Sequence, residues 1–146
     1  MYTQKMLGLA EAQKAVDAIL AEARKDPNNK PIAVCVCNYY GHVLAAATMD
    51  GTPWFAAIQC RGKAYTAATM RRDTPVVWQF SKDEGYGNIN SQFGMDLTAG
   101  PGGAVIVKEG ETNPFGGYGG IGVGGRKGEE DMQLARLGVK AIQDML

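Results

Sequence analysis

The stretch that most constrains the fold is the run from Gly116 to Gly125, in which only Tyr118, Ile121 and Val123 interrupt the glycines. A glycine inside regular structure costs roughly 0.5–1 kcal/mol relative to alanine. Such a run therefore indicates a place where the backbone approaches another element or a ligand closely. Ile121 and Val123 alternate with glycine, which predicts a strand, and the acidic segment Glu129–Asp131 that follows predicts the start of a helix. We expect this strand to deliver a helix N-terminus to a pocket.

Hydrophobic periodicity predicts the other elements, in the order α-β-β-α-α-β-β-α. Because hairpin-length turns separate neighbouring strands, we expect an α+β fold, with a mostly antiparallel central sheet of about four to five strands and helices packed on it. A chain of 146 residues with 45% apolar residues predicts a single domain over residues 1–146. The expected helices are Thr3 to Arg24, Trp54 to Arg71, Val76 to Lys82 and Lys127 to Leu146, and the expected strands are Pro31 to Cys37, His42 to Met49, Ala104 to Lys108 and Gly119 to Gly124.

Charge and hydropathy exclude several classes of partner. The 15 basic and 15 acidic side chains cancel, so the chain lacks the clustered basic face that nucleic acid requires. No apolar run reaches the roughly 20 residues that span a bilayer, and the first residues lack a signal-peptide layout. We therefore expect a cytoplasmic protein with no nucleic-acid or membrane partner. A near-neutral surface does not oppose self-association, which makes a homo-oligomer plausible.

The three cysteines do not predict a disulfide framework. Cys35 and Cys37 are two positions apart in an expected strand, so both point to the same face and form a poor bridge. The main interpretation of these residues and of Cys60 is that they are small buried hydrophobic side chains in a reducing compartment. A thiolate ligand or nucleophile is the alternative. With a single histidine, the chain has no Cys/His zinc spacing.

Phosphate-binding motifs do not explain the glycine run. A dinucleotide fingerprint needs G-x-G-x-x-G directly between a strand and a helix, early in a βαβ unit. A P-loop needs G-K-[ST], whereas Arg126 and Lys127 are followed here by Gly128. Two interpretations stay open, namely close strand–helix packing and a pocket wall of backbone N–H groups that binds an anion such as a carboxylate. On the second interpretation the ligand-binding residues are Gly122, Gly124 and Gly125.

Lys63, Glu130 and Asp131 are the candidate catalytic residues. Lys63 lies on the alanine-rich face of its expected helix, where an ammonium group must reach solvent or find an acidic partner. The glycine strand would bring Glu130 and Asp131 beside the same cleft, where a carboxylate could transfer protons. We expect a hollow with Lys63 on one wall and these carboxylates on the other. Helix capping and dipole stabilisation are the alternative roles of the two acids.

His42 is the only histidine, so a mechanism with two imidazoles is excluded. It is a solvated turn residue, a general base or a ligand of haem iron or another metal. Arg71 ends a helix, where a cation stabilises the dipole, and is a further candidate ligand-binding residue. Tyr118 belongs to a set of aromatic residues at loops and element ends, a location typical of pocket rims and interfaces.

The chain resembles, over nearly its whole length, the GlcG/HbpS-like family (DUF336, the haem-degrading domain family), which includes the C-terminal domain of PduO-type proteins. No single motif is decisive, but six occur in the family's order. The matching elements are the N-terminal alanine-rich helix, Ile32–Asn38 with Gly41–Leu44, Met49–Gly51, Ile58–Ala67, Pro101–Gly103, and Gly120–Gly125 with Glu130–Asp131.

The resemblance implies an antiparallel sheet with helices on both sides, assembly into dimers to octamers, and a small-ligand role in which haem is the best-attested ligand. Some members are linked to redox sensing, haem handling or cobalamin metabolism. This chain departs from the family pattern at Asn38, where an acid is usual, and at Thr48, where an arginine is usual. The family serine near Gly124 or Gly125 is also missing. Asn38 is therefore included among the candidate ligand-binding residues as part of a specialised pocket.

Three functions follow as hypotheses. The first is a small-ligand-binding protein, with haem as a possible ligand and His42 or a cysteine bound to its iron. The second is a cofactor-independent isomerase, hydrolase or deaminase that acts on a small unsaturated or aromatic-derived carboxylic acid in a catabolic pathway. In that case Lys63 would anchor the carboxylate. The third is an assembly subunit without a pocket. The sequence requires no cofactor, and only haem is suggested.

Overall fold

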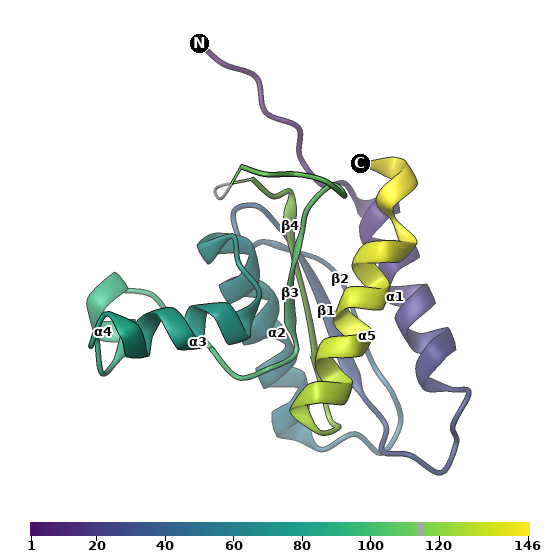
Figure 1. Ribbon diagram of the computed structural model, residues 1–146. Coiled ribbons are helices and arrows are strands. Elements are labelled where there is room, and N and C mark those ends of the chain that lie inside the picture. The colour runs from purple at the N-terminus through teal and green to yellow at the C-terminus, as the bar shows by residue number, and fades with distance from the viewer. Residues whose placement is uncertain (114–115) are drawn as a thin grey trace.

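The computed structural model describes residues 1–113 and 116–146, which form a four-stranded antiparallel sheet with helices on both faces (Figure 1). The predicted α+β fold is confirmed. The strand order is β2-β1-β4-β3. The elements are α1 (Leu9–Ala23), β1 (Ala33–Asn38), β2 (Val43–Thr48), α2 (Trp54–Met70), α3 (Thr74–Asp83), α4 (Ile89–Phe93), β3 (Gly103–Ile106), β4 (Gly119–Gly124), α5 (Gly128–Ala141) and the 3-10 helix η1 (Gln143–Met145).

The ends of two helices differ from the prediction. Helix α1 begins at Leu9 and not near Thr3, because the backbone N–H of Gly8 donates to the Glu11 carboxylate at 2.9 Å and caps the helix there. Helix α5 ends at Ala141, and the last residues continue as η1. This capping hydrogen bond between Gly8 and Glu11 therefore determines where α1 begins.

Helices α1 and α5 cover one face of the sheet and α2 covers the other, as Figure 1 shows. On the first face, inward side chains of β1 and β4 such as Val34, Val36 and Ile121 pack with α1 and α5 in the main core. On the second face, Ala33, Cys35 and other small residues of β1 pack against α2. Large apolar side chains therefore fill one side of the sheet, and the other side is packed with small ones.

Strand β4 lies directly against α2 because it has no side chains on that face. A methyl group on Gly122 would overlap the Cys60 carbonyl oxygen and lie 2.5 Å from the Ala64 nitrogen. A methyl group on Gly124 would lie 2.8 Å from the Ala56 carbonyl oxygen. The close strand–helix packing that was one interpretation of the glycine run is what the structure shows.

The two edge strands of the sheet differ in how their outward main-chain groups are hydrogen-bonded. Along the β3 edge, the Thr74 hydroxyl accepts from the Gly103 N–H at 3.0 Å, and Asp73 accepts from the Val105 N–H at 3.0 Å. Along the β2 edge the Met49 N–H donates to the Ile32 carbonyl, just before β1, so the alternation of the ladder turns the main-chain groups of Ala46 and Thr48 outward. The β3 edge is thus capped by side chains, whereas the described residues provide no such cap along the β2 edge.

A smaller unit of α3 and α4 extends from the side of the sheet that α2 covers (Figure 1). Val77, Ile89 and Leu97 form its own small core. No helix among the described residues is long and apolar enough to cross a bilayer.

Candidate functional site

The turn between β1 and β2 holds the only histidine beside an aromatic pair and an arginine. The Asn38 side-chain oxygen accepts from the backbone N–H groups of Tyr40 and His42, both at 3.0 Å, and so fixes the turn. The Tyr40 ring centroid lies 5.2 Å from that of Tyr39 and 6.2 Å from that of His42. The Arg71 guanidinium, at the end of α2, lies 3.9 Å from the centre of the Tyr39 ring. We call these five residues the turn cluster.

Two features of the turn cluster are typical of a binding surface. His42 and Tyr40 are exposed, so the imidazole is accessible to an exogenous ligand. Arg71 adopts a left-handed backbone conformation (φ 55°), and it is the only residue with a positive φ among the described residues other than glycine. A non-glycine residue in this region carries strain of about 1 kcal/mol or more. Here it ends α2 and places the guanidinium over the Tyr39 ring.

Lys63 and Asp131 form an ion pair inside the protein. Their Nζ and carboxylate oxygen are 3.5 Å apart, and both side chains are buried. Lys63 also donates to the Val123 carbonyl at 2.9 Å, and Asp131 accepts from the Arg126 N–H at 3.1 Å. Burial raises the pKa of Asp131 to about 6, although Lys63 and the Arg126 N–H oppose the shift. Lys63 therefore finds the acidic partner that an inward lysine needs.

The hollow that we expected between Lys63 and the glycine strand is filled by the protein. The glycines of β4 touch the α2 backbone, and a side chain on Gly102 would lie 3.0 Å from the Lys63 Nζ. None of the five described cavities is lined by Lys63 or Asp131. The prediction of a hollow is wrong. Because β4 has no side chains on this face, α2 packs directly against the strand.

The other acid and the glycines of the candidate set have structural contacts. The Glu130 carboxylate accepts from the Lys127 N–H at 3.2 Å and from the Asn29 side chain at 3.3 Å, and these bonds lower its pKa. Gly125 has φ 124°, and a side chain there would meet the Pro31 carbonyl oxygen at 2.5 Å. Gly122 pairs with both neighbouring strands, so its amide group belongs to the sheet. Their assignment to ligand binding or catalysis stays a prediction.

The cysteines are buried free thiols packed between β1 and α2. The Cys35 and Cys37 sulfurs are 4.0 Å apart. Their hydrogen bond lowers the pKa of Cys35 and, together with burial, raises that of Cys37. Burial raises the pKa of Cys60 to about 12. Burial and protonation make Cys37 and Cys60 poor ligands for a large planar cofactor.

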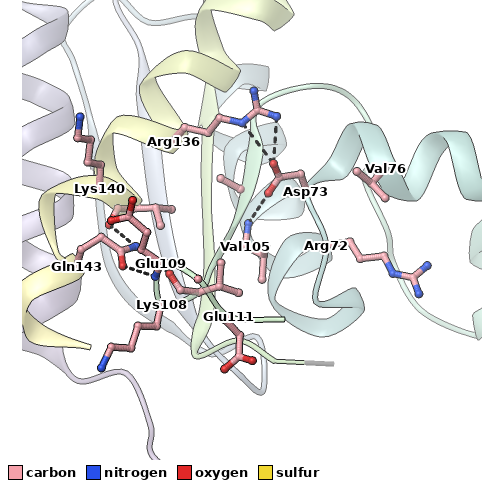
Figure 2. Close-up of a pocket in the computed structure, with 14 residues that line it drawn as sticks. Arg72, Asp73, Val76, Val105, Lys108, Glu109, Glu111, Arg136, Lys140 and Gln143 are labelled. Carbon is pink, nitrogen blue, oxygen red and sulfur yellow. Dashed lines mark hydrogen bonds and ion pairs between the residues drawn. The ribbon is translucent and has the colours of Figure 1, made fainter. Parts of the chain in front are cut away.

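The largest of the described cavities is a groove of about 760 Å³ along the β3 edge, between α3 and α5 (Figure 2). The Arg136 guanidinium pairs with Asp73 at 3.2 Å. Gln143 donates to the Val107 carbonyl at 2.8 Å and accepts from the Glu109 N–H at 2.7 Å. No sequence pattern indicated this groove, because its residues come from three separate segments and share no motif. Its lining residues are Arg72, Asp73, Val76, Ala104, Val105, Val107–Glu111, Arg136, Val139, Lys140 and Gln143.

This groove has an apolar floor and charged walls, an arrangement that suits a small amphipathic molecule. Its size lies within the usual range of ligand pockets, about 300–1,000 Å³. Its described lining includes no histidine, cysteine or methionine that could bind iron. It can hold a ligand by shape and charge, but it offers no axial ligand to haem.

The structure separates the predicted site residues into two groups, with Tyr118 apart from both. Asn38, His42 and Arg71 meet in the turn cluster. Tyr118 comes just before Gly119, which pairs with Asn38, and it lines a separate cavity of about 350 Å³ with residues from both ends of the chain. The second group, in the interior or at the start of α5, consists of Lys63, Gly122, Gly124, Gly125, Glu130 and Asp131.

These features define a class of protein: an α+β domain in which a glycine strand lies bare against a helix, with an aromatic turn at one end of the sheet. The family "Haem degrading protein HbpS-like" matches residues 7–140. The chain belongs to this HbpS-like family.

Solved structures show the same fold. An HbpS double mutant from Streptomyces reticuli is 24% identical, with a TM-score of 0.81 over 97% of this chain and 90% of that one. A PduOC:heme complex is 19% identical, with a TM-score of 0.79 over 94% and 96%. The Klebsiella pneumoniae protein ORFY is 20% identical, with a TM-score of 0.75 over 97% and 95%. No curated protein sequence matches the chain.

Proposed function

We propose that this protein binds haem at the turn cluster, with His42 as the iron ligand. The observation that carries the proposal is the position of the only histidine, which is exposed beside two tyrosine rings and an arginine. An imidazole is a common axial ligand of haem iron. Membership in the HbpS-like family and the fold shared with a PduOC:heme complex support the choice of ligand.

The residues of the turn cluster fit the chemistry of the group. His42 would hold the iron, the tyrosine rings would lie against the macrocycle, and Arg71 would bind a propionate as a charge-assisted partner. Asn38 acts through the backbone, since it holds the His42 N–H in the turn. Bound haem would supply a redox-active iron with strong visible absorption.

The test is a titration of the protein with hemin. The wild type should show a saturable Soret band, and His42→Ala should shift or lose it. Cys60→Ser is the control for thiolate ligation and should leave the spectrum unchanged, because the Cys60 side chain is buried. An unchanged spectrum in His42→Ala would contradict the proposal.

Two adjacent arginines provide a matched pair of variants. Arg71 lies over Tyr39 in the turn cluster, whereas Arg72 lines the groove at the β3 edge. Arg71→Asn should weaken hemin binding at least about tenfold, because a charge-assisted hydrogen bond is worth roughly 1.5–3 kcal/mol. Asparagine also tolerates the left-handed conformation. Arg72→Asn should have no effect, and the reverse result would contradict the assignment of Arg71 to haem binding.

A further inference from the structure

We propose that the groove along the β3 edge is a second ligand site and that it takes an N-acylated apolar amino acid. Such a molecule carries three groups that the groove can recognise, namely a secondary amide, an apolar side chain and a carboxylate. The inference goes beyond haem binding and does not depend on it, because the described lining of the groove shares no residue with the turn cluster.

Two main-chain groups of the β3 edge point away from the sheet, namely the Val105 carbonyl and the Val107 N–H. In a strand, the N–H and the carbonyl of one residue point to the same side. The Val105 N–H donates outward to Asp73 at 3.0 Å, so the Val105 carbonyl also points outward. The Val107 carbonyl accepts from Gln143 at 2.8 Å, so the Val107 N–H points outward as well. Both residues line the groove.

These two groups lie in a gap between the side chains that cap the edge. Asp73 caps one end of the gap and Gln143 caps the other. Among the described residues, neither the Val105 carbonyl nor the Val107 N–H has a hydrogen-bond partner. Unpaired main-chain groups on a sheet edge bind added backbone, which is how many sheets recognise peptides. The gap is therefore a place where one backbone-like group of a ligand can bind.

A single acylated amino acid has the spacing that this gap requires. In a parallel ladder, one residue bonds to two residues of the neighbouring strand, one on each side of its own position. The amide N–H of the ligand would donate to the Val105 carbonyl, and a carboxylate oxygen would accept from the Val107 N–H. An ester or a simple fatty acid lacks the donor, so the gap selects for the amide.

The rest of the groove suits the acyl group and the apolar side chain of the ligand. Val76 of α3 and Val139 of α5 line it from the two helices, and Val76 is 52% exposed. The volume of about 760 Å³ is more than a free amino acid fills. A free amino acid would also bring an ammonium group against this apolar lining, at a cost in desolvation. Acylation removes that charge.

Charge in the groove favours the carboxylate. Outside the ion pair of Asp73 with Arg136, the other charged residues of the described lining are three cations and two acids, namely Arg72, Lys108, Lys140, Glu109 and Glu111. The Glu111 carboxylate already accepts from an N–H of its own loop at 2.8 Å. Lys108 and Lys140 form no salt bridge with a described residue. Because Lys108 directly follows Val107, a carboxylate at the Val107 N–H would lie close to a cation.

The first test is an NMR titration with N-acetyl-L-leucine. It should bind saturably, with a dissociation constant of about 1 mM or below for a molecule of this size. The backbone amide signals of Val107 and Lys108 should shift, and that of His42 should not. Two analogues should each bind about threefold to tenfold more weakly. They are the ester, in which oxygen replaces the amide N–H, and N-acetyl-L-leucinamide, which lacks the carboxylate.

Two variants of α3 provide a matched pair. Val76 and Trp78 are both 52% exposed, but only Val76 belongs to the described lining of the groove. Val76→Glu places a carboxylate beside that of the ligand and should weaken binding at least about tenfold. Trp78→Glu should leave binding unchanged. Both positions are exposed, so both variants should fold.

Three results would overturn the inference. They are a wild type that shows no saturation up to about 10 mM N-acetyl-L-leucine, an ester that binds as tightly as the amide, and a Val76→Glu variant that binds as tightly as Trp78→Glu. A hemin titration of Val76→Glu should match that of the wild type. A failure of haem binding is therefore seen separately from a failure of this second site.

Discussion

One row of residues crosses the α2-facing side of the sheet, with one residue from each strand, and its two ends differ sharply. Ala46, Cys35, Gly122 and Gly103 are aligned in register across β2, β1, β4 and β3. At the Gly103 end a side chain would lie 2.7 Å from the Lys63 carbonyl oxygen, whereas Ala46 is exposed. Along this row, a strand residue that lies in close contact with α2 cannot carry a bulky side chain. Where the helix is absent, the strand keeps side chains that another surface can cover.

The largest expected effect comes from adding one methyl group where this row of residues lies against α2. Gly122→Ala should destabilise the protein by about 3 kcal/mol or more, because the new group meets α2 backbone atoms that cannot move separately. Ala46→Val, in the same row, should change stability by less than about 0.5 kcal/mol in monomeric protein. Urea unfolding of both variants measures the difference. Equal effects would show that the row is packed evenly.

The buried carboxyl group of Asp131 should also make the free energy of unfolding depend on pH. The pKa of Asp131 is raised from 3.8 to about 6 in the folded state. The folded state therefore binds more protons between these values, and stability should fall as pH rises from about 4 to about 6, by roughly 1–3 kcal/mol. Unfolding at pH 4.5 and 7.5 checks this, with Asp131→Asn as the comparison. If both proteins changed equally with pH, the carboxyl of Asp131 would not be the titrating group.

A further comparison is between threonines at the two edges. Thr74→Val removes a buried hydroxyl that bonds to the Gly100 carbonyl at 2.7 Å and to the Gly103 N–H, and it should cost about 1–3 kcal/mol. Thr48→Val at the β2 edge should change the free energy of unfolding by less than about 0.5 kcal/mol. Thermal or chemical unfolding distinguishes them. A large effect at Thr48 would mean that the β2 edge is structured by contacts of its own.

Much of the fold could be predicted because local patterns reflect packing directly. The alternation of Ile121 and Val123 with glycine predicts both the strand and its bare face. Lys63 on a small-residue helix face predicts an acidic partner, and Asp131 provides it. The apolar run of β1 predicts a strand covered on both faces, as the structure shows.

The candidate site could be predicted only in part, because distances between elements are not encoded in local pattern. A glycine strand opens space or closes it depending on how far the helix moves, and here Cys60 and Ala64 of α2 reach the strand. The meeting of Arg71 with Tyr39 depends on a left-handed residue at the helix end, for which arginine gives no signal. The groove at the β3 edge depends on contacts such as Asp73 with Arg136, which lie far apart in the chain.

The side-chain-free contact of β4 with α2 has a consequence for motion. Carbonyl oxygens of α2, such as those of Cys60 and Ala56, sit against the α-carbons of β4, so no flexible side chain can absorb a sliding or rotating displacement. The helix and the strand should therefore move together as one rigid body. Conformational adjustment to a ligand would be confined to parts that lack such contact, namely the β1–β2 turn and the α3–α4 unit.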